Sequence, residues 1–197
     1  MSINQQPILE ALKNRRSIYP NMYASRPIEQ EVIESILESA NWAPTHKLTE
    51  PWRFMVFHGQ GLQRLAQFQA NLYKQVQTEA GNYKEEQYQK LLNKPLLASH
   101  IIAIGMKRDE KARVPEIEEI SAVACAVQNM YLAANAQGVG CYWGTGGVTY
   151  YPEAKSFFGL APEDKLMGFM YMGYLKSDHW PEGKRQPIAP KVTWVNE

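Results

Sequence analysis

The sequence has 197 residues, and its 21 Lys and Arg nearly balance its 20 Asp and Glu, giving a formal net charge of +1. Nucleic-acid-binding proteins usually carry a basic excess, because neutralising phosphates supplies most of their affinity, so this balance argues against a nucleic-acid partner. With 45% hydrophobic and 21% charged residues, the composition is that of a globular protein and excludes a disordered or collagen-like chain. The length supports one core, so we expect a single domain.

Local features exclude other classes of protein. The longest apolar run, residues 98–106, contains His100 and is far shorter than the roughly 20 residues of a membrane span. Residues 1–7 are polar and lack the apolar region of a signal peptide. Cys125 and Cys141 show neither a metal-ligand spacing nor a disulfide pattern. We therefore expect a cytoplasmic protein without a metal site or a membrane partner.

The N-terminal half alternates helices with a strand. Apolar residues at helical spacing predict helices over residues 8–16 and 27–43, and a proline ends the second. Alternating aromatic and β-branched residues predict a strand over 52–57, and a helix over about 62–79 follows two glycines. Residues 79–94 are too polar to bury much surface, so we expect an exposed helical excursion there.

The C-terminal half contains the most apolar elements. Residues 99–106 predict a buried strand, and a helix over 115–137 begins with glutamates that suit the positive end of its dipole. The Ala-rich part of that helix is apolar on nearly all faces, which predicts burial on every side. Two strands over 139–143 and 166–175 enclose a short helix over 153–158.

The order of these elements predicts one mixed α+β domain over residues 1–175. Residues 176–197 carry three prolines and no periodic apolar face, so this tail cannot fold alone. It is either disordered or an arm of the same domain laid across another surface, and Trp180, Trp194 and Val195 favour the arm.

The glycine-rich segment over residues 138–147 is not a nucleotide-binding motif. Trp143 occupies the third glycine position of a dinucleotide fingerprint, and the Gly-Lys-Ser/Thr of a phosphate loop is absent. A helix end followed by a glycine turn, where backbone can approach a ligand closely, is the simpler interpretation. Nucleophilic catalysis is also poorly supported, because Cys125 lies in the apolar helix, where an inert buried thiol is expected.

Two polar segments could bind a ligand. Arg15, Arg16 and Ser17 suit the charge-assisted hydrogen bonds of a phosphate group, although basic residues also complement a helix C-terminus. His46 and Lys47 follow a proline in a loop, where a solvated pair is the alternative. The glutamates that begin the long helix are better explained by its dipole than as an acid–base pair.

The order of the motifs is more specific than any one of them. Along the chain follow Arg-Arg-Ser, Ala-Pro-x-His-Lys, x-Pro-Trp-x-Phe, Ser-Ala-x-x-Cys-Ala, Gly-x-Gly-x-x-Trp-x-Thr-Gly and Gly-Phe-x-Tyr-x-Gly. This series resembles the nitroreductase family of FMN-dependent NAD(P)H oxidoreductases, most closely its short subgroup with Arg-Arg-Ser and Ala-Pro-x-His-Lys. The resemblance runs from about Ile8 to Gly173 and implies a central mixed, mainly antiparallel sheet flanked by helices.

The resemblance implies where the ligands bind. The motif for the phosphate and ribityl end of FMN is matched by Arg15, Arg16 and Ser17. The helix end and loop that contact the flavin are matched by Trp42, His46 and Lys47. The segment that lines the flavin from the partner side is matched by Trp143, Gly144 and Thr145. A proposed nicotinamide contact is matched by Ala133, Ala134, Asn135, Ala136, Gln137 and Gly138.

The resemblance also implies a homodimer with FMN at the subunit interface, to which the arm over residues 176–197 would reach. NADH or NADPH would reduce FMN, which would then pass electrons to a nitroaromatic, a quinone or a similar flat acceptor by a ping-pong mechanism. The flavin carries this chemistry, so no catalytic side chain is expected. The alternatives are an FMN-binding redox module with little turnover, or another FMN reaction of the same fold such as dehalogenation.

Three positions depart from the family pattern. Trp42 and Gly144 stand where cations are common, and Glu50 replaces a usual glutamine. The departures leave the phosphate contacts of those positions, and the choice between NADH and NADPH, undecided. Arg16 and Lys47 are our candidate cations for the flavin N1/O2 edge.

Two further roles stay open at the level of sequence. Lys47, or Lys184 or Arg185 of the tail, could replace the missing positive charge. Residues 79–94, with Tyr83 and Tyr88, are either a lid that shapes the acceptor pocket or a solvated helix.

Overall fold

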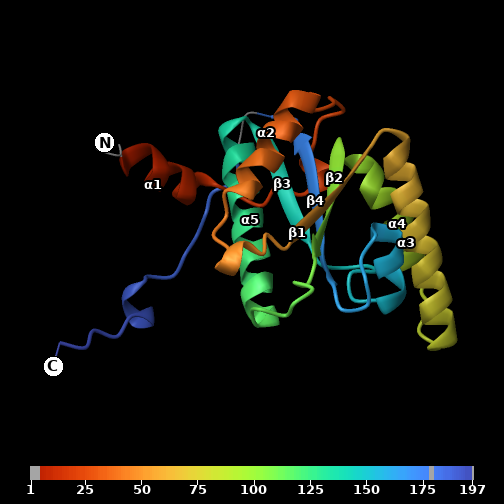
Figure 1. Cartoon of the computed structure of the whole chain (residues 1–197). Coiled ribbons are helices and arrows are strands. Elements are labelled where there is room, and N and C mark those ends of the chain that lie inside the picture. Colours follow the sequence, from red (N-terminus) through yellow and green to blue (C-terminus); the bar gives the residue numbers. More distant parts are fainter. Residues whose placement is uncertain (1–4, 178–179, 197) are drawn as a thin grey trace.

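A four-stranded antiparallel sheet forms the centre of the computed structural model, which describes residues 5–177 and 180–196 (Figure 1). The strand order is β1-β2-β4-β3. The strands are β1 (Trp52–His58), β2 (His100–Met106), β3 (Val139–Gly144) and β4 (Lys165–Tyr174). All three pairings are antiparallel, so the predicted α+β fold with a mainly antiparallel sheet is confirmed.

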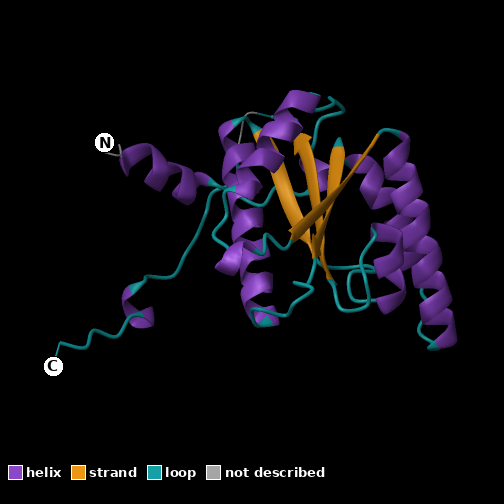
Figure 2. Ribbon diagram, in the orientation of Figure 1, coloured by secondary structure: helices purple, strands orange, loops and turns teal. Residues whose placement is uncertain are grey.

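Helices cover both faces of this sheet. The helices are α1 (Gln5–Asn14), α2 (Gln30–Asn41), α3 (Gln60–Glu79), α4 (Glu85–Asn93) and α5 (Glu116–Ala136), with the 3-10 segment η4 at Pro152–Phe158. Figure 2 shows α2 and α5 on one face and α3, α4 and η4 on the other. Every predicted helix and strand is present within a few residues. The second helix begins at Gln30 rather than at Pro27, because Glu29 is still extended.

The two faces of the sheet give the protein two apolar cores. Ile102 and Ile104 of β2 belong to the core beneath α2 and α5, whereas Ile101 and Ala103 belong to the core beneath α3 and η4. All seven residues of β2 are therefore buried. A strand covered on both faces reads as a continuous apolar run, which is why residues 99–106 are recognisable from the sequence.

Helix α5 is not buried on every side, and that prediction is wrong for the single chain. Its flanks pack on α2 and the sheet, but Cys125 and Ala136 of the Ala-rich part are exposed, and Ile117 in the first turn is 65% exposed. No described element of the same chain covers this face, so apolar composition alone did not reveal the uncovered side. The expectation of a buried Cys125 thiol is wrong for the same reason.

Both ends of the chain leave the layered body. Figure 1 shows α1 and the C-terminal tail projecting from it on the same side. Large apolar side chains of these segments are exposed: Ile8, Leu9, Leu12, Ile188, Trp194 and Val195. The parts of the predicted arm at residues 178–179 and 197 lie outside the described residues. Among those described, no helix has the length and apolar content needed to cross a bilayer.

Candidate functional site

Tyr131, near the end of α5, connects three of the motif segments. The Arg15 guanidinium carbon lies 4.9 Å from the centroid of its ring. Its hydroxyl accepts a hydrogen bond from the Trp143 N–H at 2.6 Å and also hydrogen-bonds the Ser17 side chain. Ser17 itself forms a parallel bridge with Cys141 of β3. Burial raises the pKa of Tyr131, so the hydroxyl stays neutral and fixes the backbone of β3 against the Arg-Arg-Ser segment.

The turn after β3 is shaped by a glycine in the neighbouring strand. Gly168 has a φ of +116°, and a Cβ there would lie 2.5 Å from the Gly144 oxygen and 2.9 Å from Trp143 Nε1. The register between β2 and β4 shifts beside this residue. The shift leaves the Met167 carbonyl free to accept a hydrogen bond from Trp143 Nε1 at 2.9 Å. Glycine is therefore required for β4 to approach the turn this closely.

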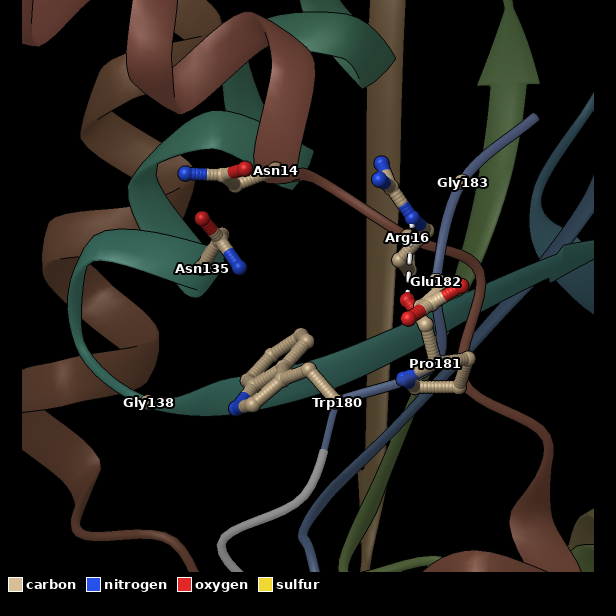
Figure 3. Close-up of a pocket in the computed structure, with 8 residues that line it drawn as sticks. All are labelled: Asn14, Arg16, Asn135, Gly138, Trp180, Pro181, Glu182 and Gly183. Atoms are coloured by element: carbon tan, nitrogen blue, oxygen red, sulfur yellow. Dashed lines mark hydrogen bonds between the residues drawn. The ribbon is translucent and has the colours of Figure 1, made fainter. Parts of the chain in front are cut away.

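A cavity of about 590 Å³ lies beside Arg16, between α1, the end of α5 and the tail (Figure 3). Arg16 Nε donates to the Pro181 carbonyl at 3.1 Å, and Nη1 donates to the carbonyls of Lys13 and Arg15 at 2.6 and 2.7 Å. A Cβ on Gly183 would lie 2.1 Å from Arg16 Cζ. The guanidinium thus holds the tail, whereas Arg15 stacks on Tyr131, so the two arginines do not form one shared fork.

The predicted nicotinamide segment forms the last turn of α5 and the glycine that ends it. Asn135 and Gly138 line the cavity beside Arg16, and Figure 3 shows the Asn135 amide near that of Asn14. Ala134 is buried, and the Gln137 amide donates to the Ala133 carbonyl at 3.2 Å. The segment therefore presents one polar side chain and one glycine to the cavity.

The loop over residues 43–50 lies elsewhere. His46 Nδ1 is 2.5 Å from Glu118 Oε2, and Lys47 Nζ donates to the Arg113 carbonyl at 2.9 Å. Trp42 is 79% exposed, and its Nε1 donates to Glu38. The loop contains three non-glycine residues with positive φ, namely Lys47, Leu48 and Glu50. Such backbone costs about 1–3 kcal/mol per residue and occurs mostly at functional sites.

Within one chain the two groups of predicted residues are far apart. The loop leads into β1, while Trp143 belongs to β3, and these are the two edges of the sheet, about 14 Å apart at 4.8 Å per strand. Along α5, Glu118 contacts His46 and Tyr131 contacts Arg15, so about 20 Å of helix lies between them. The structure brings together Arg15, Ser17 and Trp143, but it does not bring His46 or Lys47 to them.

A second cavity, of about 220 Å³, lies between α3, α4 and the turn at Gly144, Gly146 and Gly147. Lys94 lines it, with Nζ 4.7 Å from the ring centroids of both Tyr142 and Tyr171. Burial, and to a lesser extent the charge of Lys90, lowers the pKa of Lys94. The cavity thus combines glycine backbone, aromatic walls and a partly desolvated cation.

In residues 79–94 the tyrosines and the other side chains of α4 have different neighbours. Tyr83 packs between Tyr73 and Tyr88, and Lys74 lies 5.9 and 5.7 Å from the Tyr83 and Tyr88 ring centroids. These tyrosines therefore hold α4 to α3 and are not among the residues that line either cavity. The residues of α4 that do line the second cavity are Gln87, Lys90 and Leu91.

The other candidate groups are structural. Glu119 is buried, forms an ion pair with Arg108 and accepts the Asp109 N–H at 2.8 Å, so it closes the loop before α5. Cys141 is fully buried, which raises the pKa of its thiol and makes it unreactive. Among the described residues, no group of three His, Cys, Asp or Glu side chains could hold a metal ion.

Comparison with known proteins identifies the family of this chain. Residues 12–174 match the sequence model of the Nitroreductase family. The chain belongs to the nitroreductase family. The protein named "Putative NAD(P)H nitroreductase YdjA" of Escherichia coli K12 is 38% identical over 169 residues, covering 84% of this chain and 86% of YdjA. Membership in the family confirms the predicted resemblance and the prediction of an oxidoreductase enzyme.

Solved structures show the same nitroreductase fold. A nitroreductase-like family protein from Bacillus cereus superposes with a TM-score of 0.79 at 28% identity, covering 96% of each chain. A nitroreductase with bound FMN from Bacteroides fragilis superposes with a TM-score of 0.69 at 21% identity, covering 96% of this chain and 98% of that one. The predicted nitroreductase-like fold is therefore confirmed for this family member.

Three residues of the candidate site were missed by sequence reasoning. Tyr131 is the one polar ring in the Ala-rich helix, and a buried tyrosine needs a partner for its hydroxyl, which was a usable signal. No such signal exists for Lys94 and Gln69, because a lysine or a glutamine in a polar segment is expected to be solvent-exposed. Only the packing of α4 against α3, beside the glycine turn, places them at a cavity.

Proposed function

We propose that the protein is an FMN-dependent oxidoreductase that transfers electrons from NADH or NADPH to a flat acceptor such as a nitroaromatic or a quinone. The observation that carries this proposal is the meeting of Arg15, Ser17 and Trp143 at Tyr131, because it gathers separate family motifs beside two cavities. The relatives support it, since one is named as an NAD(P)H nitroreductase and one contains FMN.

The residues present fit FMN at both of its ends. Arg15 and Ser17 would hold the phosphate end, and Lys184 and Arg185, which follow directly after the glycine that packs on Arg16, would add positive charge. The glycine turn and the cavity beside Lys94 would receive an edge of the flat ring. FMN, when bound, would supply the electron transfer between the nicotinamide and the acceptor.

The side chains around the ring position would tune this chemistry. Lys94 replaces Arg16 as our candidate for the cation at the N1/O2 edge, because Arg16 is occupied by the tail and Lys94 lines the cavity that would receive the ring. Lys47 lies at the other sheet edge of the same chain, so it would act here only from a second subunit. A partly desolvated ammonium beside the ring favours negative charge there and so raises the reduction potential. Neutral Tyr131 would keep the Trp143 backbone in position without exchanging a proton.

A complete site would need a second copy of the chain. We infer a homodimer in which the loop with His46 and Lys47 of one subunit reaches the Arg15 and Trp143 side of the other. The distance between these groups within one chain supports this arrangement, as do the uncovered face of α5 and the apolar residues of α1 and the tail. The partner's contribution would then be the loop, rather than the segment over residues 143–145.

An anaerobic absorbance titration tests the proposed function. The FMN-loaded protein should lose its flavin absorbance when NADH or NADPH is added and regain it when a quinone or nitroaromatic follows. The ratio of bleaching rates would give the preference between the two nicotinamides. Absence of bleaching by either would instead favour an FMN-binding module without turnover.

A further inference from the structure

The cavity between α3, α4 and the glycine turn contains a buried side chain that has an unused hydrogen-bonding group. Gln69 lies in the middle of α3 and is 1% exposed. Its Nε2 atom has no hydrogen-bond partner among the described residues, and Gln69 lines the cavity. An unpaired buried amide destabilises a fold, so native proteins rarely keep one without a ligand, water or ion to satisfy it.

The rest of this cavity has matching chemistry. Lys90 and Lys94 bring positive charge and Gln87 brings a second amide, whereas no carboxylate is among the residues that line it. Tyr142 and Tyr171 provide aromatic surface beside the Lys94 ammonium. Amide donors and cations without an acid favour a ligand oxygen that is anionic or strongly polarised.

The size of the cavity limits what enters it. Its volume of about 220 Å³ is below the roughly 300–1,000 Å³ of a pocket for a drug-sized ligand. It therefore takes a single ring, or the edge of a larger ring system whose remainder lies outside. The positive φ of Gly147, where a Cβ would lie 3.1 Å from Leu91, keeps the turn close to α4 at this point.

We propose that Gln69 is a ligand-binding residue whose amide donates a hydrogen bond to a carbonyl or anionic oxygen on a flat ring seated against the glycine turn. The identity of the ring rests on the proposed function: it is the edge of FMN or the electron acceptor. Both carry the same kind of oxygen, and ligand titrations distinguish them.

Three variants test this role. Gln69→Leu removes the amide and keeps a similar size, and Gln69→Glu replaces the donor by an acceptor beside two lysines. Gln63→Leu is the matched control, because Gln63 is an exposed glutamine on the same helix. In the ligand-free protein, Gln69→Leu should leave Tm unchanged or raise it, since the unpaired amide is gone. A Tm clearly below that of Gln63→Leu would show a structural hydrogen bond and overturn the proposal.

Titrating FMN into the apoprotein, followed by quenching of flavin fluorescence, locates the oxygen. If it belongs to FMN, Gln69→Leu should raise the Kd of FMN about tenfold and Gln69→Glu should raise it further. If it belongs to the acceptor, the Kd of FMN should stay at the wild-type value. The Kd of 4-nitrobenzoate, read from the oxidised flavin spectrum without a nicotinamide, should then rise about tenfold.

Unchanged affinity of Gln69→Leu for both ligands would overturn the proposal. A wild-type protein that binds no FMN would instead contradict the proposed function. In that case 4-nitrobenzoate binding to the apoprotein, measured by calorimetry, still tests Gln69 on its own.

Discussion

A site assembled from two chains predicts that two defective variants can complement each other. Arg15→Ala with Arg16→Ala removes the phosphate side, and His46→Ala with Lys47→Ala removes the loop side. In each homodimer both sites lack one half. In a heterodimer of the two variants, twofold symmetry places both defects in one site and leaves the other site with two wild-type halves.

The size of the effect follows from the contacts that are lost. A charge-assisted hydrogen bond contributes about 1.5–3 kcal/mol, so loss of the Arg15 contact should weaken FMN binding about 10- to 150-fold. Loss of Arg16 would in addition release the tail at Pro181 and weaken binding further. Each homodimer should therefore purify with little flavin, while the heterodimer should retain one FMN.

The assay is co-expression of the two variants with different affinity tags, two purification steps and measurement of bound FMN per dimer. The wild-type dimer carrying both tags is the control for full occupancy. A heterodimer as colourless as the two homodimers would refute the two-chain site. It would mean that His46 and Lys47 act within their own chain, despite their place at the opposite edge of the sheet.

Three further predictions concern Tyr131, His100 and the C-terminal tail. Tyr131→Phe keeps the ring under Arg15 but leaves the Trp143 N–H unpaired. It should lower the free energy of unfolding by about 1–3 kcal/mol, and Tm by about 2–4 °C for each kcal/mol. Tyr150→Phe is the control: Tyr150 is 74% exposed, so its Tm should stay at the wild-type value. His100 is buried and stacks on His58. Burial, and to a lesser extent the charge of His58, lowers the pKa of His100 from 6.5. Its contribution to stability is therefore complete above pH 6.5 and is lost as the pH falls from 6.5 through the folded-state pKa. Ring NMR titration should show that pKa below 6.5 and only partly restored in His58→Gln; a value at or above 6.5 in the wild type would contradict the burial argument. Truncation after Leu175 removes the exposed apolar tail and should shift the dimer toward monomer in sedimentation velocity, while an unaltered dimer would show that the tail is not an interface.

The fold could be predicted largely from local pattern. Strand β2 is apolar on both faces, which predicts that both are covered, and α2 carries one apolar stripe, which predicts that one side faces the core. The uncovered face of α5 could not be predicted, because Ile117 and Cys125 are as apolar as their buried neighbours. Composition indicates which side chains favour burial. Whether another helix, strand or subunit packs over them depends on the whole assembly.

The site was predictable in part for a similar reason. Arg15 and Ser17 lie beside a helix end and Trp143 lies beside a glycine turn, and both features can be predicted from the sequence. Their meeting at Tyr131 depends on the pairing of Ser17 with Cys141, a contact between segments more than a hundred residues apart. Lys94 and Gln69 line a cavity only because α4 packs beside them. The polar sequence of α4 has no pattern from which this packing could be predicted.

If the two halves of the site come from different subunits, flavin binding is linked to protein concentration. When a ligand binds only the associated form, mass action makes it strengthen the association, and the reverse holds equally. Dilution below the dissociation constant of the subunits would release flavin without any change in the chain itself. The amount of holoenzyme in a cell would then rise more steeply than the amount of polypeptide, because each new site requires two chains to meet.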